Sequence, residues 1–256
     1  MAARVIALVY GVVSYVCFLV VFLYAVGFVG NIGVPRGIDG AATTPFATAL
    51  VIDLVLLATF AVQHSVMARP AFKRAWTRIV PPAVERSTYV LAASAALALL
   101  FWQWRPLGGV VWRIDTPWLG ALLVALSAFG WGLVLVTTFL IDHFELFGLK
   151  QVWRCFRGAA SAPAHFVVPG PYRMVRHPLY LGFLIAFWAA PTMTMAHLVF
   201  AVMTTAYIVV AIQLEERDLI VAHPEYAAYR REVPMLVPMP GRRDDADSTA
   251  TASTRW

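Results

Sequence analysis

The chain has 256 residues, of which 61% are hydrophobic and 13% charged, and its mean hydropathy is +0.73. This composition is too apolar for a water-soluble domain of that size, so lipid must cover much of the surface. A net charge of +6 would fit a nucleic-acid-binding protein, but the basic residues do not form a soluble patch, so no nucleic-acid partner is expected.

Four apolar stretches are long enough to cross a bilayer as helices, which takes about 20 residues. They cover residues 5–29, 47–66, 87–104 and 118–141. The first begins just after Arg4 and continues without a small-residue cleavage site. We therefore expect it to remain as the first membrane helix and not to be removed as a signal peptide.

A fifth apolar region, residues 179–213, is too long for one helix and is interrupted by Pro191-Thr192-Met193-Thr194. It predicts a hairpin of two shorter helices, which brings the expected number of transmembrane helices to five or six. Residues 214–233 then predict a helix that leaves the membrane and is disturbed by Pro224.

Two further segments are polar. Residues 142–178 form the longest polar stretch and, with several prolines, predict an irregular and functional loop. Residues 241–256 contain too few apolar side chains to pack, so we expect a disordered tail after a single membrane domain, residues 1–240.

The Lys and Arg residues lie mainly in alternate loops. Residues 67–87 and 142–178 hold five each and the stretch from Arg217 onward holds six, whereas the remaining loops hold three. Because cytoplasmic loops carry the excess of basic residues, we expect an all-α protein of the inner membrane with both termini in the cytoplasm. Cys17 and Cys155 lie far apart in this topology, so neither a disulfide nor a metal site is expected.

Placing an ionisable side chain within the bilayer costs free energy, so each such residue needs a structural or functional explanation. His64 lies between Gln63 and Ser65 at the predicted end of helix 47–66, where a polar helix end would also explain it. Asp142, His143 and Glu145 follow helix 118–141. Acidic residues at a helix C-terminus oppose the helix dipole, which favours a functional role for this group.

Two more polar groups flank the predicted hairpin. Residues 170–182 bring Arg173, Arg176, His177 and two tyrosines to its start, and Glu215-Glu216-Arg217-Asp218 follows its end. Because a hairpin returns its ends to one place, we expect these groups to be neighbours at the cytoplasmic face. Together they supply both charges needed to hold a zwitterionic ligand, and no glycine-rich phosphate-binding fingerprint is present.

At these positions the sequence resembles a known family. RHPLYLG at 176–182, EERDL at 215–219 and HPEYAAYRREVP at 223–234 resemble the C-terminal signature of the isoprenylcysteine carboxyl methyltransferase superfamily. One departure is His223-Pro224-Glu225, where many relatives have Phe-Gly.

The N-terminal part of the chain narrows the resemblance. VQHSVMARPAFKRAW at 62–76, ERSTYVL at 85–91 and DHFELFGLKQVW at 142–153 look like the methanethiol S-methyltransferase branch, close to the NnrU-like proteins. The resemblance implies methyl transfer from S-adenosylmethionine to methanethiol, giving dimethyl sulfide and S-adenosylhomocysteine. Hydrogen sulfide and methaneselenol are further candidate acceptors.

The resemblance also implies which residues form the site. The implied cofactor-binding residues are Arg173, Arg176, His177, Tyr180, Gly182, Glu215, Glu216, Tyr226, Tyr229 and Arg230. A thiol reacts as its thiolate, so a base beside it would help. The candidate catalytic residues are His64, His143 and Glu145, with Asp142 in the same group.

Three alternatives remain at this point. A carboxyl methyltransferase of the isoprenylcysteine type would need a lipid-facing slot for its acceptor. Membrane reductases that use NADPH share an Arg-His-Pro-x-Tyr-x-Gly motif, although this chain has no evident second basic cluster for a 2′-phosphate. A non-enzymatic membrane protein of the NnrU type would not bind S-adenosylmethionine.

Overall fold

The computed structural model describes residues 1–159 and 168–238 of the chain. Its long helices are α1 (Ala2–Gly30), α2 (Phe46–Ala68), α4 (Pro82–Gln103), α5 (Pro117–Ile141) and α9 (Met195–Ala222). The short elements are α3 (Pro70–Trp76), β1 (Val110–Arg113), α6 (His143–Leu146), α7 (Leu149–Arg157), the 3-10 helix η1 (Gly170–Arg173), α8 (Pro178–Trp188), β2 (Thr192–Thr194) and α10 (Tyr226–Glu232).

The five long helices are long and apolar enough to cross a membrane, so the chain is an all-α integral membrane protein as predicted. On α1 the side chains of Ile6, Val20 and Leu23 are about 60% exposed or more. Only a lipid environment makes such a surface stable. The predicted disordered tail from residue 241 lies outside the described residues.

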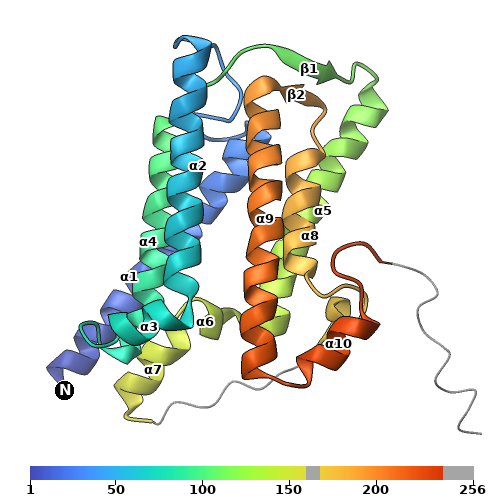
Figure 1. Cartoon of the computed structure of the whole chain (residues 1–256). Helices are drawn as coiled ribbons and strands as arrows, with labels where there is room; N and C mark the ends of the chain where they lie inside the picture. The colour runs from blue at the N-terminus through green and yellow to red at the C-terminus, as the bar shows by residue number, and fades with distance from the viewer. Residues whose placement is uncertain (160–167, 239–256) are drawn as a thin grey trace, which may run out of the picture.

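The long helices run side by side, with the short helices α3, α6, α7 and α10 at one end and the strands at the other (Figure 1). α4 packs against α1 and α2, α5 packs against α8, and α9 contacts both α2 and α8. Near the strands, an aromatic core joins these groups of helices, with Phe28 packed against Phe101, Trp104 and Phe200.

The predicted hairpin forms, but its two arms differ greatly in length. α8 has 11 residues and is therefore about 16 Å long, too short to cross a hydrocarbon core of about 30 Å. α9 has 28 residues and continues without a break through the segment from Leu214 that the sequence assigned to a separate helix. The expectation of two shorter helices therefore holds for α8 and is wrong for α9.

The break after α9 falls at the departure from the family pattern. α9 ends at Ala222, and α10 begins at Tyr226, whose backbone N–H donates to the carbonyl of His223 at 2.9 Å. Pro224 lacks an amide hydrogen and so cannot continue the helix, and the chain turns there. The predicted disturbance at Pro224 is confirmed.

Two expectations for the loops are corrected. Residues 142–178 are not irregular throughout, because α6, α7 and η1 lie within them. In addition β1 pairs antiparallel with β2, Val110 opposite Thr194 and Arg113 opposite Thr192, which was not expected in an all-α chain. This ribbon connects the start of α5 to the turn between α8 and α9.

Candidate active site

The polar residues that flank the hairpin come together where α8 begins and α9 ends. Pro178 occupies the first turn of α8, where its missing amide hydrogen costs nothing, so Arg176 and His177 lie just before the helix. Glu215 and Glu216 lie in the last two turns of α9. The predicted neighbourhood of the Arg-His-Pro segment and the acidic pair is confirmed by direct contacts.

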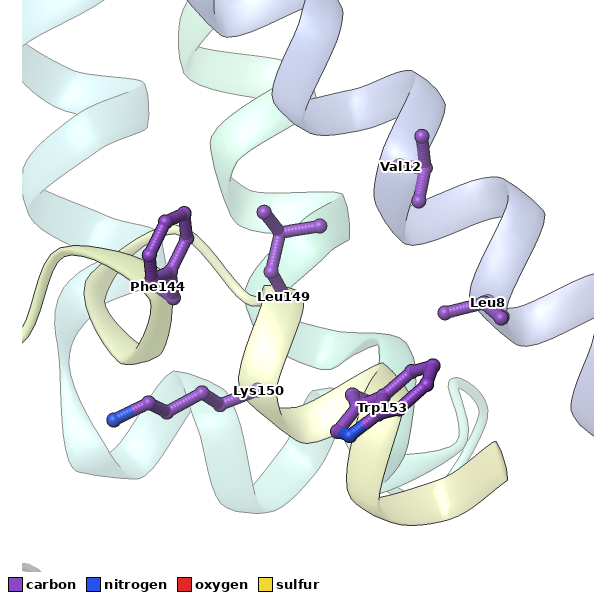
Figure 2. A pocket seen from close by; sticks show the side chains of 6 residues that line it. All are labelled: Leu8, Val12, Phe144, Leu149, Lys150 and Trp153. Carbon is purple, nitrogen blue, oxygen red and sulfur yellow. The ribbon is translucent and has the colours of Figure 1, made fainter. Parts of the chain in front are cut away.

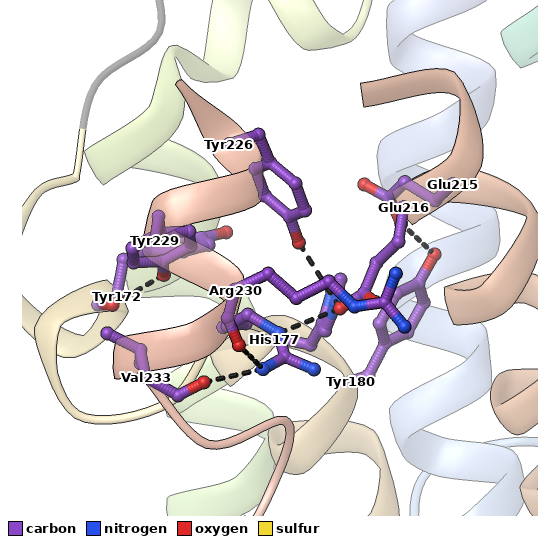
Figure 3. A network of polar contacts seen from close by, with 10 residues as sticks. Tyr172, His177, Tyr180, Glu215, Glu216, Tyr226, Tyr229, Arg230 and Val233 are labelled. Carbon is purple, nitrogen blue, oxygen red and sulfur yellow. Dashed lines mark hydrogen bonds and ion pairs between the residues drawn. The ribbon is translucent and has the colours of Figure 1, made fainter. Parts of the chain in front are cut away.

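The centre of this group is the carboxylate of Glu216 (Figure 3). Its Oε1 lies 2.8 Å from Arg176 Nε and 3.0 Å from His177 Nε2, and it accepts a hydrogen bond from the Tyr226 hydroxyl at 3.3 Å. Its Oε2 lies 3.0 Å from Arg230 Nε. We call Glu216 and these four partners the Glu216 network.

Burial makes the Glu216 network energetically demanding. The side chain of Glu216 is 4% exposed and that of Arg176 is 10% exposed. A buried charge must be paired and hydrogen-bonded, and both oxygens of this carboxylate are. Arg230 differs from the others, since its side chain is 50% exposed and so reaches solvent.

The segment after α10 locks Arg176 in place. Arg176 Nη1 donates to the carbonyls of Arg230 and Val233, at 2.8 and 2.5 Å. The backbone N–H groups of Arg176 and His177 donate to the carbonyls of Pro234 and Met235. Residues 233–235 could not be assigned to the site from the sequence, because every residue type has a backbone carbonyl that can accept a hydrogen bond.

Tyrosines close the Glu216 network on the α10 side. The Tyr229 hydroxyl donates to the carbonyl of Tyr172 at 2.5 Å. Burial, with the nearby Glu216 carboxylate, raises the pKa of Tyr229 to about 12, although Arg176 opposes the shift. Burial likewise raises the pKa of Tyr226 well above its usual value. Both hydroxyls therefore stay protonated and donate at neutral pH.

Glu215, the neighbour of Glu216, has a different environment. Its Oε2 accepts a hydrogen bond from the Tyr180 hydroxyl at 2.9 Å. The ion pairs of the described residues include none for Glu215. Glu215 is therefore a carboxylate with spare hydrogen-bonding capacity at the edge of the Glu216 network.

His64 lies beside this edge, on the last turns of α2. The Tyr89 hydroxyl is 2.8 Å from its Nε2, Phe60 stacks on its ring at 5.2 Å, and the Tyr207 ring lies edge-on at 6.5 Å. Aromatic side chains of α2, α4 and α9 therefore enclose the His64 ring.

The acidic residues after α5 have a structural explanation. Asp142 is both the C-cap of α5 and the N-cap of α6, and its Oδ1 accepts from the backbone N–H of Glu145 at 3.1 Å. Burial raises the pKa of Asp142, but the ion pair with Lys150 and this cap outweigh it and hold the pKa below its usual value. Glu145 pairs with Arg154 at 2.9 Å. Both carboxylates also lie at the start of α6, a favourable helix end for a negative charge, and their catalytic role stays a prediction.

His143 is 4% exposed and packed between α1 and α5. Tyr15 lies 2.8 Å from its Nε2 and Thr138 lies 2.8 Å from its Nδ1, while Phe139 stacks on the ring at 4.2 Å. Burial lowers the pKa of His143, so the imidazole is neutral and both nitrogens are in use. The structure does not bring His143, Asp142 or Glu145 into contact with the Glu216 network.

Gly182, a predicted cofactor contact, lies where α8 crosses α5. A Cβ at Gly182 would lie 2.8 Å from the carbonyl oxygen of Gly130 and 3.0 Å from the backbone nitrogen of Val134. A Cβ at Gly130 would meet the backbone of Gly182 and Ala186 at 2.6 Å. The two helices therefore touch backbone to backbone, and packing alone accounts for glycine at both positions.

Comparison with known proteins agrees with this geometry. The model of the isoprenylcysteine carboxyl methyltransferase (ICMT) family matches residues 132–221, which contain both motifs that meet at Glu216. A methanethiol S-methyltransferase of Mycobacterium tuberculosis is 55% identical over 240 residues, 93% of this chain and 98% of the relative. No solved structure matches the chain at a significant level.

Further relatives carry the same name. A methanethiol S-methyltransferase of Crocosphaera subtropica is 52% identical, covering 94% of this chain and 95% of its own length. One from a Pseudomonas species is 47% identical, covering 93% of this chain and 92% of the relative. The chain therefore belongs to the methanethiol S-methyltransferase branch of the isoprenylcysteine carboxyl methyltransferase family.

Proposed function

We propose that this membrane protein transfers the methyl group of S-adenosylmethionine to methanethiol, releasing dimethyl sulfide, S-adenosylhomocysteine and a proton. The observation that carries the proposal is the meeting of the two family motifs in one cluster of two guanidinium groups, an imidazole and two carboxylates, with Glu216 buried at its centre. Groups of both charges at this place suit a zwitterionic amino-acid moiety bound beside the cluster. Hydrogen sulfide and methaneselenol fit the same reaction as alternative acceptors.

The contacts separate binding residues from supporting residues. The Glu216 carboxylate is already paired by three cationic or imidazole side chains, and Arg176 Nε and Nη1 are engaged by Glu216 and two carbonyls. Arg173, at the end of η1, is exposed and has no acidic partner within residues 1–159 and 168–238. We therefore assign Arg173 to the cofactor carboxylate and Glu215 to its amino group or ribose.

Replacing Arg173 by Gln is expected to weaken cofactor binding about tenfold or more, since a hydrogen bond to a charged group contributes about 1.5–3 kcal/mol. The unfolding temperature should stay unchanged because Arg173 supports no other described residue. Calorimetric titration with S-adenosylhomocysteine measures the first quantity and a thermal melt the second.

Arg176→Gln is the matched comparison. It should lower the unfolding temperature as well as the affinity, because it leaves the buried Glu216 carboxylate without its closest partner. If Arg173→Gln binds S-adenosylhomocysteine as tightly as the unchanged protein, the assignment of Arg173 is wrong.

Bound S-adenosylmethionine supplies an electrophilic methyl group on a sulfonium. The protein must align the acceptor sulfur with that methyl group and remove the thiol proton, because the thiolate is the nucleophile. We propose His64 as the proton acceptor. Its two nitrogens share one described partner, the Tyr89 hydroxyl, whereas both nitrogens of His143 have partners of their own.

His64→Ala is expected to lower the turnover number at saturating methanethiol by about 10²–10⁴-fold, the range typical of a lost general base. S-adenosylhomocysteine binding should change little. His143→Ala should instead lower stability and leave most turnover intact. Equal turnover losses in both variants, or none in His64→Ala, would remove His64 from this role.

We further propose that the site faces the cytoplasm. The N-terminus, the Glu216 network and the basic segments around α3, α7 and α10 lie at one end of the helices (Figure 1). Basic segments favour the cytoplasmic side of the inner membrane. Methanethiol and dimethyl sulfide are small and apolar enough to reach this site through lipid.

An acceptor panel tests the proposed substrate. Purified protein receives S-adenosylmethionine with a deuterated methyl group, together with equal concentrations of methanethiol, hydrogen sulfide and a prenylated cysteine derivative, and mass spectrometry follows the label. We expect it first in dimethyl sulfide. Label mainly in a methyl ester would indicate a carboxyl methyltransferase, and no transfer to any of the three acceptors would contradict the proposed reaction.

A further inference from the structure

A groove with a volume of about 520 Å³ lies between α1, the start of α4 and α7, at the same end of the molecule as the Glu216 network but away from it. Its walls are mostly aliphatic, with Ile6 and Ala7 on α1 and Val80 and Val84 opposite. Ile6 is 68% exposed, so the groove opens on the surface that lipid covers. Acyl chains are the ligands that such a wall accepts.

The walls of this groove are fixed by tight packing. Val152 of α7 is fully buried, and a Cβ at Gly11 of α1 would lie 2.5 Å from its Cγ2. Across the groove, the Tyr10 hydroxyl of α1 donates to Thr88 Oγ1 of α4 at 3.0 Å. The groove is therefore a built feature of α1, α4 and α7.

One cation lines the groove, and two more lie close to its lining residues along the chain. Arg4 lines it directly, and a Cβ at Gly158, just after α7, would lie 2.9 Å from Arg4 Nη1. Arg157 precedes that glycine, and Arg78 lies two residues before the lining Val80. All three arginines are exposed, and within residues 1–159 and 168–238 none has an acidic partner. The three guanidinium groups are therefore available to bind an anion.

A second groove on the other side of α7 provides a contrast. It has a volume of about 410 Å³ and is lined by Leu8, Val12, Phe144, Leu149, Lys150 and Trp153. Figure 2 shows the Lys150 ammonium turned away from α1, and that ammonium pairs with Asp142. This groove therefore has an apolar wall but no free cation.

We propose that the groove between α1, α4 and α7 binds an anionic phospholipid, with its phosphate at Arg4 and Arg157 and an acyl chain along Ala7 and Val84. Charge complementarity selects the anionic headgroup, and the aliphatic wall selects a lipid over a free phosphate. The lipid would hold the amphipathic helix α7 at the membrane surface. The proposal is independent of the methyl-transfer reaction.

The test uses the full-length protein in a mild neutral detergent. Phosphatidylglycerol or phosphatidylcholine with identical acyl chains is titrated in, and native mass spectrometry measures the bound lipid. We compare the unchanged protein, Arg4→Gln/Arg157→Gln, Ala7→Phe to fill the groove while keeping its cations, and Arg217→Gln/Arg231→Gln as a control with the same loss of charge on α9 and α10.

We expect tighter retention of phosphatidylglycerol than of phosphatidylcholine. The Arg4/Arg157 variant should bind it roughly 30-fold more weakly, from the contribution of two surface cations, and Ala7→Phe should also weaken it. The control should bind as the unchanged protein does. Equal retention of both lipids, or equal losses in the control and the Arg4/Arg157 variant, would overturn the proposal. Phosphatidylglycerol binding by Ala7→Phe that is as tight as in the unchanged protein would also overturn the proposal.

Discussion

Glu216→Gln is expected to give the largest loss of both stability and cofactor binding. Oε1 of Glu216 accepts from Arg176, His177 and Tyr226, and Oε2 faces Arg230. A Gln amide presents NH₂ donors to one of these groups and leaves the buried Arg176 cation without a counter-charge. Breaking a buried ion pair costs about 3–5 kcal/mol, which corresponds to a fall in unfolding temperature on the order of 10 °C.

Cofactor affinity should fall roughly 100-fold in the same variant, because the Glu216 network holds the start of α8 against the end of α9. Glu225→Gln is the matched control, since its side chain is 57% exposed and the same charge is removed. A thermal melt and S-adenosylhomocysteine titration of both variants give the result. Indistinguishable melts would mean that the Glu216 network does not support this end of the fold.

Gly130→Ala is expected to destabilise the protein by about 1–3 kcal/mol or more through overpacking. The added Cβ would lie 2.6 Å from the nitrogen of Ala186 and the oxygen of Gly182, well inside ordinary van der Waals contact. Both are backbone atoms, so no side-chain rotation relieves the clash and α8 must move away from α5. Because Arg176 and His177 lie at the start of α8, cofactor affinity should fall too.

Gly132→Ala is the control on the same helix. Nothing lies within 4 Å of a Cβ at Gly132, and alanine favours a helix over glycine by about 1 kcal/mol. Its melt should be unchanged or slightly higher, whereas Gly130→Ala should melt earlier. Equal melting of the two variants would show that α5 and α8 are not in tight backbone contact.

The helices could be predicted from sequence because the bilayer sets their length. Predicted ranges such as 5–29 and 118–141 agree with α1 and α5 within a few residues at each end. The meeting of the RHPLYLG and EERDL motifs followed from the hairpin alone. The long apolar runs make both the helix ranges and the hairpin easy to predict, since a water-soluble fold rarely contains an apolar run of that length.

Other features could not be predicted, because they depend on tertiary contacts. Pro191 marked a turn but not how unequal α8 and α9 are, and the strand pairing of Val110 with Thr194 has no local signal beyond a short β-prone run. Asp142 both ends α5 and caps α6, and its residue type alone does not reveal the second role.

For the site residues too, the sequence predicted which residues belong to the site, whereas their contacts required the structure. Residue types and the family resemblance named Arg176, His177 and Glu216 together, but only the contacts show that they bind one another. The two candidate histidines, His64 and His143, are equivalent in sequence terms. Their hydrogen-bond partners distinguish them, because His143 has two and His64 shares one hydroxyl between its nitrogens.

The most direct test of the central claim is headspace gas chromatography on the purified protein given S-adenosylmethionine and methanethiol, with His177→Ala measured in parallel. The imidazole of His177 contacts Glu216 at 3.0 Å and is 5% exposed, so the variant disrupts the Glu216 network. We predict dimethyl sulfide from the unchanged protein and at most a trace from His177→Ala. No dimethyl sulfide from an unchanged protein that binds S-adenosylhomocysteine would contradict methanethiol as the acceptor, and equal production by both would contradict the Glu216 network as the cofactor site.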